Sequence, residues 1–115
     1  MMEGDSQFYE CSSLESVYMP NISTIPQLAF SNCGLKNIDN NNAIIKIEAN
    51  AFDNNKSLTE INLPNVKTIG SNAFAYCTSL NKINFGERDL TNTEDGIVIQ
   101  SRAFANCALS GVIDL

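Results

Sequence analysis

The phenylalanines of this chain recur at a nearly fixed interval, and this repeat is the feature that most constrains its fold. Five of the six are 22, 22, 22 and 30 residues apart. They are Phe8, Phe30, Phe52, Phe74 and Phe104. The third residue after each one is a cysteine in four cases and Asn55 in the remaining case. Self-similarity at a period of roughly 20–50 residues is typical of proteins built from stacked copies of one unit.

The unit that begins at Leu58 shows the pattern most clearly. It reads Leu-x-x-Ile-x-Leu-Pro from Leu58 to Pro64 and Ala-Phe-x-x-Cys from Ala73 to Cys77. The alternation of Ile61 and Leu63 predicts a short strand with one buried face, which the proline then ends. A second extended or turned segment up to Ile69 follows, and Gly70 allows a tight corner. Ser71 or Asn72 could cap a short helical turn that carries Phe74 and Cys77 on one face.

One such unit cannot bury its apolar residues alone. Stacking the units pairs their strands in parallel and places the phenylalanines in one buried column. The sequence therefore predicts a stack of coils in which Phe30, Phe52, Phe74 and Phe104 lie one above the other.

These motifs resemble leucine-rich repeats of the BspA-like surface-antigen class, and the resemblance extends from about Gly4 to Leu115. It implies an α/β, β-rich fold, namely a right-handed leucine-rich-repeat solenoid with short parallel strands on one face and short helical turns on the other. Residues 1–115 would then form a single domain of about five partial repeats, part of a longer array. The resemblance also implies a non-catalytic protein–protein interaction module of a cell-surface adhesin or antigen, with host or extracellular-matrix proteins as partners.

Several positions depart from the repeat. Asn55 occupies the cysteine column, and residues 39–42 replace the Leu-Pro pair of the second unit. The segments 33–35 and 107–109 are one residue short, and residues 87–96 form an insertion. The insertion is acidic and lies between Gly86 and Gly96, so we expect a mobile loop whose shortening leaves stability nearly unchanged. It is also a weak recognition candidate, because insertions often decorate the binding face of a solenoid.

Composition excludes several functions. Histidine is absent, which removes histidine-based triads and the common zinc motifs. A net charge of −6 argues against nucleic-acid binding, and no apolar run is long enough to insert into a membrane. The N-terminal residues are acidic and lack the apolar stretch of a secretory signal. A surface or secreted location therefore rests on the resemblance, and a cytoplasmic one stays open.

The four cysteines are 22, 44 and 30 residues apart and include no CxxC pair. They are expected to be reduced, buried and unmetalled, with no cofactor anywhere in the chain. Bridges between Cys11 and Cys33 or between Cys77 and Cys107 are the alternative.

The residues that flank the inward position of each first strand should point to solvent. They form the pairs Ser16 and Tyr18, Asn37 and Asp39, Glu60 and Asn62, Lys82 and Asn84, Gly111 and Ile113. We expect a protein partner to bind this continuous strand face at Tyr18, Asp39, Glu60, Asn62, Lys82 and Asn84, with Tyr18 as aromatic anchor. The acidic balance favours a basic patch on that partner. The alternative is a structural spacer or self-assembling unit whose open ends associate end to end.

Overall fold

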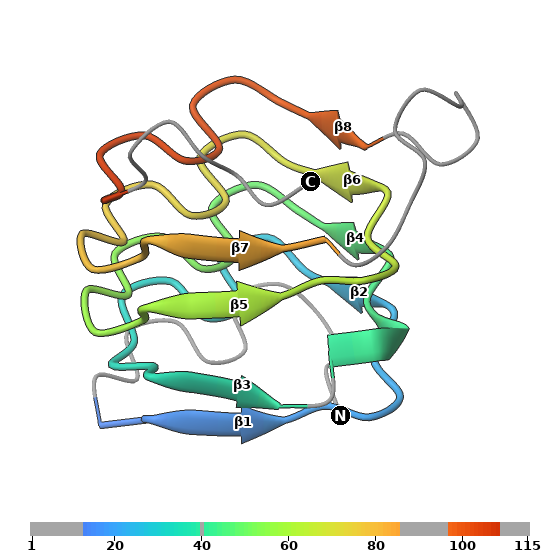
Figure 1. The fold of residues 1–115 in the computed structure, drawn as a ribbon, viewed down its shortest axis with the longest axis horizontal. Helices are drawn as coiled ribbons and strands as arrows, with labels where there is room; N and C mark the ends of the chain where they lie inside the picture. Colours follow the sequence, from blue (N-terminus) through green and yellow to red (C-terminus); the bar gives the residue numbers. More distant parts are fainter. Residues whose placement is uncertain (1–12, 40, 86–96, 109–115) are drawn as a thin grey trace.

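The computed structural model describes residues 13–39, 41–85 and 97–108, and the chain runs through them in stacked coils (Figure 1). Each coil carries two short strands. In chain order the elements are β1 (Ser16–Tyr18), β2 (Thr24–Ile25), β3 (Asn37–Asp39), the 3₁₀ helix η1 (Asn41–Ala43), β4 (Lys46–Ile47), β5 (Glu60–Asn62), β6 (Thr68–Ile69), β7 (Lys82–Asn84) and β8 (Val98–Ile99). The predicted repeat thus has a regular structural counterpart.

All strand pairs are parallel, as predicted. The sheets have the orders β1-β3, β5-β7 and β2-β4-β6-β8. Figure 1 shows β1, β3, β5 and β7 stacked on one side of the molecule and the four-stranded sheet on the other. Register follows the sequence repeat, with Ile47 beside Ile25 and Ile69 beside Ile47, so that like residues stack.

The phenylalanine rings form a stacked column in the hydrophobic core. Successive rings of Phe30, Phe52, Phe74 and Phe104 stack with centroids 5.4, 5.2 and 5.4 Å apart and planes within 9° of parallel. The first three rings are fully buried, which confirms the prediction for them, whereas Phe104 is only half-buried. Stacked rings supply both apolar burial and a directional contact.

The predicted helical turns around each phenylalanine are wrong. These segments are runs of tight turns instead, with a left-handed residue two positions before and two positions after each ring. The eight residues with positive φ are Leu28, Asn32, Asn50, Asn54, Asn72, Tyr76, Arg102 and Asn106. Five of them are asparagine, the non-glycine residue that tolerates this conformation best.

Hydrogen bonding explains why these turns are not helical. The Phe30 N–H donates to Ala51 O at 2.8 Å, and the Phe74 N–H to Ala103 O at 2.7 Å, in the next coil. In an α-helix each N–H would bond four residues back along its own segment. Here the left-handed residues orient every second N–H group of the turn towards a carbonyl of the next coil. Among the described residues the only helical element is η1, which joins β3 to β4.

The side that carries the first strands is divided between β3 and β5, because these two strands belong to different sheets. Leu35 follows Cys33 by two residues. In the next two coils the leucine follows the residue of the cysteine column by three, as Leu58 follows Asn55 and Leu80 follows Cys77. The second coil regains the missing residue after β3, in the segment that forms η1. Because the residue is regained there, the second strand of this coil, β4, is in register with β2 and β6.

Gly70 permits the close approach of two coils. A Cβ at this position would lie 2.7 Å from Ala49 N and 2.8 Å from the carbonyl carbon of Glu48, both backbone atoms that cannot rotate away. We expect Gly70→Ala to lower the free energy of unfolding by about 1–3 kcal/mol through overpacking. Urea unfolding followed by circular dichroism measures this change. Gln100→Ala, at the exposed equivalent position of the next coil, is the control and should stay within about 0.5 kcal/mol of wild type.

Some predictions fall on residues outside the described ranges. These are the 87–96 insertion, Cys11, and the pair Gly111 and Ile113.

Candidate functional site

The predicted strand face lies where the sequence placed it, but it is not continuous. Tyr18 pairs with Asp39 across β1 and β3, while Glu60 pairs with Lys82 and Asn62 with Asn84 across β5 and β7. The six candidate residues therefore form two separate ladders, and the expectation of one continuous sheet is wrong.

Exposure on these ladders suits surface contact. The Tyr18 side chain is 68% exposed on the edge strand β1, and Glu60, Asn62 and Lys82 are also exposed, whereas Asn84 is half-buried. Glu60 and Lys82 place opposite charges side by side, which is a favourable cross-strand pair. We call this surface the first-strand face.

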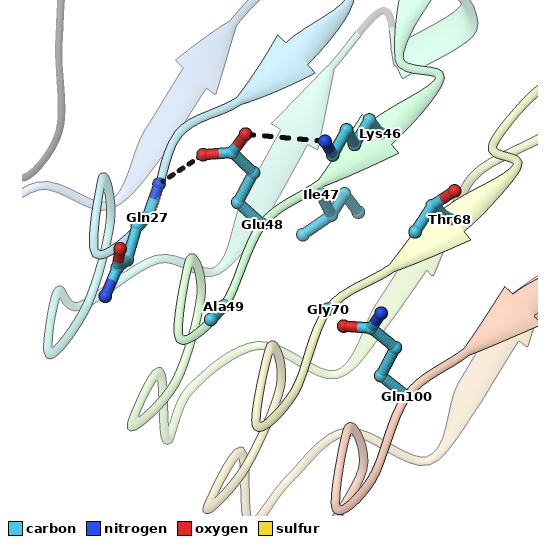
Figure 2. A pocket seen from close by; sticks show the side chains of 8 residues that line it. All are labelled: Gln27, Lys46, Ile47, Glu48, Ala49, Thr68, Gly70 and Gln100. Carbon is cyan, nitrogen blue, oxygen red and sulfur yellow. Dashed lines mark hydrogen bonds and ion pairs between the residues drawn. The ribbon is translucent and has the colours of Figure 1, made fainter.

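The continuous sheet is β2-β4-β6-β8, which the sequence alone did not reveal. Its outer surface carries an open hollow of about 390 Å³ lined by Gln27, Lys46, Ile47, Glu48, Ala49, Thr68, Gly70 and Gln100 (Figure 2). Glu48 accepts a hydrogen bond from the Gln27 backbone N–H at 3.2 Å and lies 3.8 Å from the Lys46 ammonium. The repeated dipeptides Thr24-Ile25, Lys46-Ile47, Thr68-Ile69 and Val98-Ile99 were the available signal for this sheet.

The cysteine column has a specific bonding role. The Cys77 thiol donates to Phe52 O at 3.1 Å and the Cys107 thiol to Phe74 O at 3.0 Å, each in the preceding coil. Asn55 does the same with its amide, since Nδ2 donates to Phe30 O at 2.9 Å. The column therefore requires a small buried donor, and asparagine meets this requirement.

Asn55 also compensates for the missing residue in the second coil. The Leu58 and Leu80 N–H groups bond to the carbonyl three residues earlier, at Asn55 and Cys77. Leu35 is only two residues beyond Cys33 and bonds instead to Oδ1 of Asn55, at 3.2 Å. Two departures from the repeat that look independent in the sequence are thus joined by one hydrogen bond.

The three cysteines that the structure describes, Cys33, Cys77 and Cys107, are free thiols. Burial raises the pKa of the Cys77 thiol to about 12 and raises the pKa of the half-buried Cys107 thiol as well. A thiol held in its protonated form is a poor nucleophile. Cys77 and Cys107 therefore act as hydrogen-bond donors, and their raised pKa values make them poor nucleophiles.

The raised pKa of Cys77 predicts a dependence of stability on pH. Above pH 9.0 the unfolded thiol ionises while the folded one stays protonated until about 12. The free energy of unfolding should therefore fall as pH rises through this window, by up to about 1.4 kcal/mol per pH unit. Urea titrations between these pH values measure the slope. In Cys77→Ala this contribution should be absent, so an equal slope in the two proteins would contradict the assignment.

The carboxylate of Asp53 is buried. It accepts hydrogen bonds from the Ser31 hydroxyl and, at 2.8 Å, from the Asn50 amide. Both of its oxygens are occupied by donors from the same chain, so its role is structural. Within the described ranges, no three His, Cys, Asp or Glu side chains gather as a possible metal site.

Charge is distributed unevenly along the sequence. The described residues carry five acidic and six basic side chains, although the whole chain has thirteen and seven. The acidic excess therefore belongs to residues 1–12, 86–96 and 109–115. The strand-bearing surfaces are nearly neutral.

Parallel strands in register, a buried phenylalanine column and a donor column define a protein of stacked repeats. A family model for the BspA type leucine-rich repeat region matches residues 4–113 in six copies, and the chain belongs to this family. Comparison with curated proteins gave no match, and neither did comparison with solved structures. No helix in the described parts of the chain is long and apolar enough to cross a membrane.

Proposed function

We propose that this chain is a non-catalytic protein–protein interaction module, part of a BspA-like cell-surface adhesin or antigen. The observation that carries the proposal is the repeat, which builds broad strand surfaces around a core of closely packed rings. Two of its buried polar side chains, Asn55 and Asp53, are already engaged in hydrogen bonds to other residues of the chain, both between coils and within one. Family membership supports the surface location.

The first-strand face is the proposed binding surface. Tyr18 offers an exposed aromatic anchor, and aromatic residues carry a large share of interface energy. Glu60 and Lys82 add a pair of opposite charges that could fix the orientation of a partner. Because the surface is nearly neutral, long-range attraction of a basic partner would come from the acidic segments outside the described coils.

The proposal is tested with a triple variant, Tyr18→Ala with Glu60→Lys and Lys82→Glu. A screen against extracellular-matrix proteins by biolayer interferometry first identifies a ligand. The triple variant should then bind at least about tenfold more weakly, with unchanged melting temperature.

A matched control changes the opposite sheet, with Lys46→Ala, Thr68→Ala and Gln100→Ala. This control should bind like wild type. If it loses binding while the first-strand variant keeps it, the partner uses the hollow of the four-stranded sheet instead.

The second candidate function is a structural spacer. It is favoured by the similarity of successive coil junctions, each with a ring stack and a donor to the phenylalanine carbonyl. In this reading the coils form a right-handed solenoid segment of a longer array, and both strand surfaces are inert. A screen in which no matrix protein binds would favour it.

A further inference from the structure

The left-handed positions of the tight turns do not all carry the residue type that suits them. Positive φ recurs two residues before and two residues after each phenylalanine, with values between 57° and 62°. Five of these eight residues are asparagine, which tolerates the conformation well. The other three are Leu28, Tyr76 and Arg102, whose larger side chains disfavour it. The repeat thus imposes its backbone on three residues whose local preference opposes it.

Two of these three residues lie largely in solvent. Tyr76 is 45% exposed and Arg102 is also exposed, whereas Leu28 is half-buried. Packing inside the fold therefore does not explain why Tyr76 and Arg102 stand where asparagine would fit. Departures from a local preference without an evident gain inside the fold concentrate at functional sites. Tyrosine and arginine are also residue types that are enriched in the anchors of protein interfaces.

The side of the molecule formed by the tight turns also differs in charge from the rest. We call it the turn side, which comprises residues 27–34, 49–56, 71–78 and 101–108. Its charged side chains are Asp53, Lys56 and Arg102. Asp53 is buried, and both of its oxygens accept hydrogen bonds from this chain. The exposed charges of the turn side are therefore both positive, in a chain of net charge −6, and an acidic partner is complementary to them.

The exposed groups of the turn side come from three consecutive coils. The Asn54 N–H donates to Ala75 O at 2.8 Å, so the coil of Lys56 stacks on the coil of Tyr76. The Tyr76 N–H donates in turn to Ala105 O at 2.8 Å, which places the coil of Arg102 next. A segment that runs across the coils therefore meets a cation, an aromatic ring and a second cation in that order.

We propose that the turn side is a second binding surface, and that it takes an extended acidic segment of a partner protein. Tyr76 is the anchor, because a tyrosine ring supplies a large contact area at a small loss of conformational freedom. Arg102 binds a carboxylate of the segment, since the planar guanidinium can donate two parallel hydrogen bonds to it. Lys56 adds the second cation. This inference does not depend on the first-strand face, because it uses different residues.

The first test measures stability and needs no ligand. Tyr76→Asn and Arg102→Asn place the favoured residue at each left-handed position, so each variant should raise the melting temperature by about 2–5 °C. Tyr76→Phe keeps both the ring and the unfavourable backbone, and it should melt like wild type. Thermal unfolding followed by circular dichroism gives these values. Lower melting temperatures in both asparagine variants would show that the two residues serve stability and would overturn the proposal.

The second test measures binding by fluorescence anisotropy, with the full chain and a short labelled peptide that has glutamates around a central leucine. Wild type should bind this peptide more tightly than a peptide with lysines in place of the glutamates. Tyr76→Asn and Arg102→Asn should each weaken binding at least about fivefold, although both are more stable. Tyr76→Phe should stay within about twofold of wild type, because the ring is retained.

The matched control is Lys67→Asn, which removes an exposed cation from the segment before β6. It should bind the peptide like wild type, as should the triple variant of the first-strand face. A matrix-protein screen that finds no ligand for that face would leave this assay unaffected, because its probe is defined.

Three outcomes of the binding test would overturn the proposal. Wild type could prefer the lysine peptide, Tyr76→Asn could bind as tightly as wild type, or Lys67→Asn could lose binding as well. Tighter binding of heparin through Tyr76 and Arg102 would also overturn it, because the ligand would then be an anionic polysaccharide and not a protein segment.

Discussion

Replacing Phe74 by alanine should lower the free energy of unfolding by about 3–5 kcal/mol. The ring is fully buried and stacks on Phe52 at 5.2 Å and on Phe104 at 5.4 Å. Its removal opens a cavity in the middle of the column and ends two aromatic contacts. Guanidinium unfolding monitored by circular dichroism measures the loss.

Phe104→Ala is the matched control for this experiment. Its ring is half-buried and, among the described residues, stacks only on Phe74, so the loss should be clearly smaller. Equal losses at the two positions, or an unchanged melting temperature for Phe74→Ala, would show that the column contributes little to stability.

Asn55→Ala should be the second most damaging change, with a loss of about 2–4 kcal/mol. The side chain is fully buried, and it bonds to Phe30 O, Phe52 O and the Leu35 N–H. Phe52 O keeps the Cys77 thiol as a donor, but the Leu35 N–H loses its acceptor and Phe30 O loses the amide. An unsatisfied buried backbone group costs about 1–3 kcal/mol.

Asn55→Cys separates the two roles of this residue. A thiol at this position can donate to Phe30 O, as Cys77 does to Phe52 O, but it cannot replace the acceptor for Leu35. The consensus residue of the column should therefore be less stable than wild type and more stable than Asn55→Ala. A cysteine variant as stable as wild type would mean that the Leu35 bond contributes nothing.

The repeat phase made much of the architecture predictable. Phe30, Phe52 and Phe74 lie in one buried column because a 22-residue period returns each side chain to the same place in the next coil. The solvent-facing positions of Glu60 and Asn62 followed from strand alternation around Ile61. Both inferences depend on short-range periodicity, which a sequence displays directly.

The turns around each phenylalanine were misread for a physical reason. Residues three apart, such as Phe74 and Cys77, share a face in a helical turn, but consecutive tight turns can place them on one side as well. The distinguishing signal was asparagine at the two left-handed positions, as at Asn50 and Asn54. Leu28 and Tyr76 obscure that signal, because such residues rarely adopt positive φ.

Contacts between coils were the least predictable features. The Leu35 N–H bonds to the side-chain amide oxygen of Asn55 instead of to a backbone carbonyl, and this bond joins residues 20 positions apart. The division between β3 and β5 is likewise a property of how successive coils stack. Neither can be derived from one unit considered alone, so the extent of the candidate binding surface required the structure.

The tight turns have an electrostatic consequence for the whole stack. In the turns around the phenylalanines, the N–H groups of Phe30, Phe52 and Phe74 all donate to the following coil. The N–H groups two residues before and two residues after each of these phenylalanines do the same. Peptide groups are thereby aligned head to tail along the stacking axis, as they are along the axis of an α-helix. Although these segments contain no helix, their summed peptide dipoles resemble those of one, with the positive end at the coil of residues 97–108. Each further coil would lengthen this dipole, and acidic side chains would be stabilised at that end.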